Sequence, residues 1–228
     1  MPLTAVFIVQ DSYANATTIS KITDKVSRLF PKPLGKWSLE YKLYRENPAL
    51  EGIGRQPGAQ ASSAPRYLSQ LSLSHHEHDL FCLIDEPISN AKNGNAGPNK
   101  KKIMAVFDRG MDAIVGSKLQ SLWVLRQSMR ADGMAYQVGD DFVIRLGSVT
   151  QAGAFKFILL EVAYLPGHDL DQAKPIIEDF LQSAELSSGK YYYGDTIDCN
   201  ISKSSLDPKV LKAYTGLQYM EAFRTRPN

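Results

Sequence analysis

Hydrophobic and polar residues between Asp112 and Tyr164 follow two periods, one helical and one strand-like. From Asp112 to Met129, a mostly apolar line recurs every three or four residues, which predicts one amphipathic helix. Its positions are Val115, Leu119, Leu122, Arg126 and Met129. Three β-rich runs follow, and the turns Asp140-Asp141 and Gln151-Ala152-Gly153 are short enough for hairpins. We expect these strands at Ala135–Val138, Phe142–Val149 and Phe155–Tyr164.

The rest of the chain contains further strand-like runs. Trp37–Arg45 alternates apolar and polar residues, as a half-buried strand does. Tyr67–His75 and Leu80–Asp85 predict a hairpin, and Ala5–Val9 and Ile103–Phe107 predict single strands.

Three more helices are expected. Asn15 or Thr17 caps a helix that continues to Leu29 and ends before Pro31 and Pro33. A second helix begins at Gly167, Asp169 or Asp171 and ends near Leu186, with Pro175 tolerable only in its first turn. The last helix opens at Asp207-Pro208 and continues to Phe223. Within it, Gly216 costs about 1 kcal/mol relative to alanine, so docking must stabilise this helix.

These elements indicate an α+β fold in one domain spanning residues 1–228. Seven or eight strands joined mainly by hairpins favour an antiparallel sheet, closed or nearly closed into a barrel, with flanking helices. Residues 46–66 and 89–102 lack any period and are rich in small and polar residues, so we expect mobile surface loops there.

Charge and cysteine content narrow the function classes. A net charge of +2, from 26 basic and 24 acidic residues, gives no overall field for nucleic acid or an anionic membrane. Cys82 and Cys199 are the only cysteines, which argues against a secreted disulfide framework and for the cytosol or nucleus. Neither a signal-peptide pattern nor an apolar run long enough to cross a bilayer is visible. Cys82 lies in an apolar strand and is interpreted as a core residue.

Two clusters of charged or metal-ligating residues have simple structural explanations. His75-His76-Glu77-His78 is interpreted as a polar hairpin tip, because His168 is the only other histidine and structural zinc needs about four ligands. Lys100-Lys101-Lys102 is interpreted as part of a solvated loop, although it could steer an acidic partner. We therefore predict no metal site.

No pattern of catalytic residues is visible. The chain has no Gly-x-Ser-x-Gly, no dinucleotide-binding Gly-x-Gly-x-x-Gly and no phosphate-binding loop. A tunnel-type triphosphate enzyme would line its strands with many glutamates and basic residues. The closest approach is Glu40-Tyr41-Lys42 with Arg45, while Glu161 is alone on its strand, which is too few acids to hold metal ions. We expect no catalytic residue and no cofactor.

Tyr191, Tyr192 and Tyr193 form the one candidate partner-binding feature. In an extended segment three consecutive rings cannot all face one core, because side chains alternate between faces. At least one ring should reach the surface, where tyrosine is favoured in interfaces. An edge strand that covers the sheet explains the same residues equally well.

Several of these segments, in this order, resemble the family of subunit twenty of the Mediator head module. They are Ala5–Val9, Trp37–Arg45, Ser117–Gln127, Phe142–Gly147 and Phe157–Val162. The resemblance extends from near residue 4 to the C-terminal helix and implies the same broad architecture.

That resemblance implies a non-enzymatic nuclear subunit that relays regulatory signals to RNA polymerase II at promoters. It also implies a heterodimer with Mediator subunit eighteen, with the C-terminal helix of subunit eight nearby and the other head-module subunits around it. The main alternative is a tunnel-type phosphohydrolase or ligand-binding barrel. A nucleic-acid binder is a third reading, which the near-neutral charge disfavours.

Overall fold

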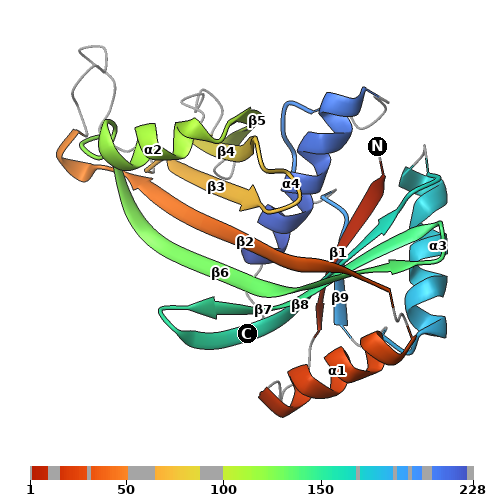
Figure 1. The fold of residues 1–228 in the computed structure, drawn as a ribbon. Helices are drawn as coiled ribbons and strands as arrows, with labels where there is room; N and C mark the ends of the chain where they lie inside the picture. Colours follow the sequence, from red (N-terminus) through yellow and green to blue (C-terminus); the bar gives the residue numbers. More distant parts are fainter. Residues whose placement is uncertain are drawn as a thin grey trace, which may run out of the picture.

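In the computed structural model, nine strands and four α-helices form an α+β fold within the described residues (Figure 1). These residues are 2–9, 16–29, 32–50, 65–87, 100–167, 170–186, 189–194, 197–201 and 207–224. The strands are β1 (Leu3–Val9), β2 (Lys32–Glu46), β3 (Tyr67–Leu73), β4 (Asp79–Pro87), β5 (Lys100–Asp108), β6 (Trp123–Val138), β7 (Phe142–Gln151), β8 (Ala154–Tyr164) and β9 (Gly189–Tyr192). The helices are α1 (Ala16–Leu29), α2 (Gly110–Ser117), α3 (Leu170–Ser183) and α4 (Pro208–Arg224), with a short 3₁₀ helix, η1, at Pro48–Leu50.

All strands belong to one antiparallel sheet in the order β5-β4-β3-β2-β6-β7-β8-β1-β9. The predicted α+β class with an antiparallel sheet and flanking helices is confirmed. Closure into a barrel is not found, because β5 and β9 end the sheet without pairing with each other.

The long helix predicted from Asp112 to Met129 is wrong in its second half. Only α2 is helical, and β6 begins at Trp123 and pairs with β2 as far as Gln137. A long strand partner satisfies the backbone of this segment, and that pairing outweighs the weak helical period of its side chains.

Most other predicted elements are confirmed, with two corrections. Lys100–Lys102 is not a loop: it begins β5, where Lys101 and Lys102 lie opposite the acidic pair Glu86 and Asp85 of β4. Pro175 lies past the first turn of α3, which begins at Leu170. Most of the two predicted mobile loops, namely residues 51–64 of the first and 89–99 of the second, lies outside the described residues.

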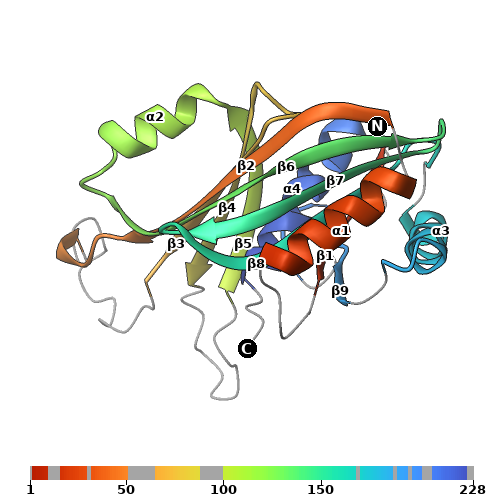
Figure 2. The ribbon, with the colours of Figure 1, turned by 60° about the horizontal axis from the view of Figure 1, so that its bottom comes forward.

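The helices cover both faces of the sheet. α1 and α3 pack against one face of β1, β7 and β8, and α2 packs through Val115 on the same side of β2 to β4 (Figures 1 and 2). α4 packs on the opposite face and contacts β3, β4 and β5 as well as β1 and β9. Since these strands stand at opposite ends of the sheet order, the sheet curls around α4.

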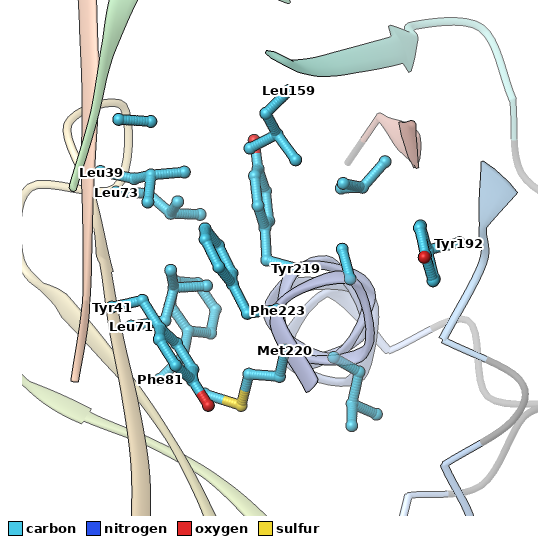
Figure 3. Close-up of a cluster of buried hydrophobic side chains, with 14 of the residues drawn as sticks. Leu39, Tyr41, Leu71, Leu73, Phe81, Leu159, Tyr192, Tyr219, Met220 and Phe223 are labelled. Atoms are coloured by element: carbon cyan, nitrogen blue, oxygen red, sulfur yellow. The ribbon is translucent and has the colours of Figure 1, made fainter. Parts of the chain in front are cut away.

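α4 is buried around its whole circumference from Ala213 to Phe223. Its apolar side chains enter the main core with Tyr41, Leu71 and Phe81 (Figure 3). Its polar side chains are buried too, and they have partners: Gln218 Nε2 donates to the Thr4 carbonyl at 2.5 Å, and the Gly194 N–H donates to Glu221 at 2.8 Å. A helix buried on all sides must satisfy its polar groups inside the protein, as these contacts do.

Gly216 allows α4 to approach the sheet closely. A Cβ at this position would lie 2.4 Å from the Phe81 ring and 2.8 Å from the Met104 methyl, closer than atoms can pack. The expectation that docking stabilises this glycine-containing helix is consistent with this contact.

We predict that Gly216→Ala destabilises the protein by about 1–3 kcal/mol, because overpacking a buried contact outweighs the better helix propensity of alanine. Gly116→Ala in α2 is the matched control, since a Cβ there meets nothing within 4 Å. The control should stabilise slightly, by about 0.5–1 kcal/mol. Urea denaturation measures both, and stabilisation by Gly216→Ala would contradict the close-packed interface.

Candidate partner-binding surface

The first part of β6 has a strand on one side only. β2 pairs with β6 from Trp123 onward, but β7 pairs with it only from Arg130. Between its first residue and Arg130, β6 curves away from the β7–β8 hairpin (Figure 1). No described strand lies on the second side of Trp123–Met129, which we call the β6 edge. An open strand edge presents backbone N–H and C=O groups that another chain can pair with.

Exposed apolar side chains surround the β6 edge. Leu125 is 50% exposed and Val124 is 38% exposed, and both lie in the open stretch. Leu122, just before it, is 44% exposed. Large apolar side chains gathered at one place on a surface mark interaction sites more often than scattered ones do.

A β-bulge determines which way these side chains point. Leu43 of β2 lies opposite Gln127 and Tyr44 lies opposite Leu125, so Arg126 is the extra residue. Leu125 therefore shares the face of Tyr44, which packs towards α2, and Val124 shares the face of Arg45, towards α4. The open stretch offers an apolar side chain on each face.

A cleft of about 270 Å³ adjoins the β6 edge where α4 ends. Its base is aromatic, because the Tyr41 ring stacks on Phe223 with centroids 4.8 Å apart. Arg224 of α4 pairs with the buried Asp85 at its far side. The lining is Tyr41, Leu43, Tyr67, Asp85, Gln127, Phe223 and Arg224, so Gln127 belongs to both cleft and edge.

The three tyrosines singled out in the sequence lie at the β9 end of the sheet, in and just after β9. Tyr192 is buried in the core around α4 (Figure 3). Tyr193 is also buried and donates a hydrogen bond to Glu178 at 2.7 Å. Tyr191 is half-buried, stacks on Tyr193 and packs against Phe7. The structure does not bring these residues near the β6 edge, and partner binding by them stays a prediction.

A buried ion centre holds the fold together beneath α4. Glu161 of β8 is fully buried, accepts a hydrogen bond from Arg145 Nη1 at 2.8 Å and accepts another from the Tyr219 hydroxyl of α4. Burial raises the pKa of this carboxyl, but Arg145, His75 and Tyr219 outweigh it and hold the pKa below its ordinary value. The sequence did not single out Glu161 as structural, because the cross-strand Arg145 becomes visible as its partner only once the register is known.

A sequence model of one family matches residues 1–224, nearly the whole chain. Its description is "TATA-binding related factor (TRF) of subunit 20 of Mediator complex". The chain belongs to this Med20 family.

Curated relatives carry the same family name. A "Mediator of RNA polymerase II transcription subunit 20" from Yarrowia lipolytica is 28% identical over 193 residues, covering 78% of this chain and 85% of the relative. The protein of that name from Schizosaccharomyces pombe is 29% identical over 191 residues, covering 83% and 81%. Among solved structures, the PH1819 protein from Pyrococcus horikoshii OT3 is matched over 98% of this chain and 100% of that chain, with 14% identity and a TM-score of 0.42.

Other candidate chemistry in this Med20-family chain has structural roles. Burial raises the pKa of the Cys82 thiol to about 12, so this thiol is a poor nucleophile near neutral pH. Within the described ranges, no three His, Cys, Asp or Glu side chains gather as metal ligands would. No helix among the described residues is long and apolar enough to cross a membrane.

The histidines at the β3–β4 turn connect this turn to the ion centre. His75 Nε2 lies 3.6 Å from Glu161, and neither of its ring nitrogens has a hydrogen-bond partner among the described residues. Burial is the main reason that the pKa of His75 falls from 6.5 to about 4, and the nearby Arg145 adds to it against the opposing effect of Glu161. His75 is therefore neutral at pH 7.

We predict that stability falls as the pH is lowered from about 6.5 to about 4. In this window the unfolded chain protonates His75 and the folded protein does not, so protons favour unfolding, by at most roughly 2–3 kcal/mol. His75→Gln should flatten this dependence, and His78→Gln, at an exposed position of the same turn, should leave it unchanged. The measurement is the urea midpoint of each protein between pH 6.5 and pH 4. An equal change of the midpoint with pH in the wild type and both variants would contradict the role of His75.

Proposed function

We propose that this chain is a non-catalytic subunit of the Mediator head module and relays regulatory signals to the RNA polymerase II machinery in the nucleus. The observation that carries this proposal is the Med20 family match over residues 1–224. In this proposal the chain forms a heterodimer with Mediator subunit eighteen, close to the C-terminal helix of subunit eight and to other head-module subunits.

A docking role agrees with the chemistry of the fold. The face on which a tunnel-type enzyme would hold its substrate is filled by α4, whose side chains pack into the core. Glu161, the acid that such chemistry would need, already has Arg145 and Tyr219 as partners. These contacts favour a structural subunit over the alternative phosphohydrolase.

Such a subunit acts by coupling binding free energies. A surface that binds one neighbour better in one arrangement of the complex shifts the population of that arrangement. The β6 edge is the surface with the strongest physical reason to bind a protein, and Tyr191 on the short strand β9 is a second, predicted contact.

We predict a stable one-to-one complex when the full chain is co-expressed with Mediator subunit eighteen of the same species. Gel filtration with light scattering should show one peak with the summed mass, and each protein run alone serves as the control. Two separate peaks at their individual masses would count against the proposed partnership.

We predict no turnover of inorganic triphosphate with magnesium or manganese, because the acid best placed for metal binding is sealed in the core. A phosphate-release assay on metal-loaded protein tests this, with a tunnel-type triphosphatase as the positive control. Saturable release of phosphate by the purified chain would contradict this prediction and support the alternative phosphohydrolase.

A further inference from the structure

Within the described residues, open strand edges occur on β5, β9, the first part of β2 and the β6 edge, and on two stretches of only three and four residues, Leu3–Ala5 of β1 and Ala154–Phe157 of β8. These edges are not equivalent. On β5, the Asn200 side chain binds both the N–H and the carbonyl of Met104, at 2.7 and 3.3 Å, so this edge is partly covered. β9 is only four residues long. The first part of β2 contains Pro33, which has no N–H, and a bulge next to it. Short strands, prolines and covering side chains are the usual protections of an edge.

The β6 edge is longer than β9 and has no proline, although it too contains a bulge and its Trp123 N–H already donates to the Leu119 carbonyl at 2.9 Å. Seven residues from Trp123 to Met129 have no described strand on one side, and they include neither proline nor glycine. Trp123, Val124 and Leu125 are residue types that favour strands or pack well in them. Another protective feature is Arg126, the exposed extra residue of the bulge.

We propose that the β6 edge receives an extended segment of a partner protein, which adds a strand to the sheet and carries acidic side chains among apolar ones. This inference rests on the proposed function, and the segment belongs to Mediator subunit eighteen. Main-chain hydrogen bonds to the open side of β6 supply affinity, and the pockets beside the edge supply specificity.

The apolar part of the segment follows from the two faces of β6. Side chains of an added strand alternate between faces. On the α4 side they lie beside Val124 and Gln127, at the opening of the cleft whose base is Tyr41 and Phe223. On the α2 side they lie beside the half-exposed Leu125. Burial of apolar side chains against both faces removes exposed apolar surface from water.

The acidic part follows from Arg126 on the edge and from Arg45 on the neighbouring strand β2. Arg126 is exposed and has no ion pair among the described residues, whereas the neighbouring Arg130 already binds Asp132. Arg45 lies opposite Val124, and its Nε is buried without a hydrogen-bond partner. Carboxylates in the incoming segment would pair with these two groups.

Charge and composition disfavour the other occupants. A second copy of this chain, paired antiparallel about the middle of the β6 edge, would bring two Arg126 side chains close together, and neighbouring like charges are destabilising. The chain's own residues 51–64 contain three glycines, a proline and only one large apolar residue, Ile53, a composition that strands avoid.

Hydrogen–deuterium exchange on the wild-type full chain, free and bound to subunit eighteen, tests this inference directly. Amides of residues 124–129 that point away from β2 should exchange rapidly in the free chain and slowly in the complex, whereas the Trp123 amide already donates to the Leu119 carbonyl. Amides of β5 should change little, because Asn200 already covers part of that edge.

A pair of matched double variants adds a quantitative readout. Leu125→Asp with Arg126→Glu should weaken subunit eighteen binding at least about tenfold, as loss of a central interface contact does. Leu34→Asp with Lys36→Glu makes the same changes on the protected part of β2, where Leu34 is 51% exposed and Leu125 is 50% exposed. This control should bind within about twofold of the wild type, since surface changes away from an interface are nearly neutral. Circular dichroism verifies that both variants fold.

The outcomes separate this inference from the proposed function. Two results together support the strand addition. The complex protects amides in the β6 edge, and the Leu125→Asp with Arg126→Glu variant loses affinity for subunit eighteen while the β2 control does not. A complex that leaves these amides unprotected overturns the strand addition and leaves the Mediator assignment intact. If the same amides become protected in the free chain as its concentration rises, a second copy of the chain occupies the edge. That result also overturns the inference. Absence of any complex with subunit eighteen removes both proposals.

Discussion

The rest of the structure depends on burying α4 inside a curled sheet, and the ion centre at Glu161 makes that burial specific. A charge with no contact to water must have its partners in place, or the fold loses several kcal/mol. Here the partners come from β7 through Arg145 and from α4 through Tyr219, and His75 of the β3–β4 turn lies against them. One carboxylate thus ties together both halves of the sheet and the helix between them.

This arrangement determines what is left for function. The side chains of α4 fill the concave face of the sheet, whereas the β6 edge has no described strand on one side. The β6 edge remains open because β7 turns away at the hairpin while β2 continues beside β6 to its first residue. Among the described residues of this Med20-family chain, a buried helix and a partly open sheet edge therefore occur together.

Local signals predicted the elements they control. Asp140-Asp141 and Gln151-Ala152-Gly153 define the strand ends of two hairpins, and Asp207-Pro208 begins α4, because turns and caps depend on a few adjacent residues. Trp123–Met129 was misassigned to a helix, since a helical period in a short apolar run cannot exclude a strand and only β2, some eighty residues earlier in the chain, selects between them. The same error concealed the β6 edge. A clue was present in the alternation of Met129 and Ala131, buried, with Arg130 and Asp132, exposed. The ion centre was beyond such reasoning, because Tyr219 and Glu161 meet only through the tertiary fold.

The most direct test of the central role of α4 is a double-mutant cycle between Tyr219 and Glu161. Urea denaturation of the wild type, Tyr219→Phe, Glu161→Leu and the double variant gives the coupling free energy between the helix and the sheet. We expect a coupling of about 1–3 kcal/mol, as found for contacting groups in one buried network. If the losses of unfolding free energy in the two single variants add up to the loss in the double variant within about 0.5 kcal/mol, the two side chains do not stabilise each other. That result would contradict the account.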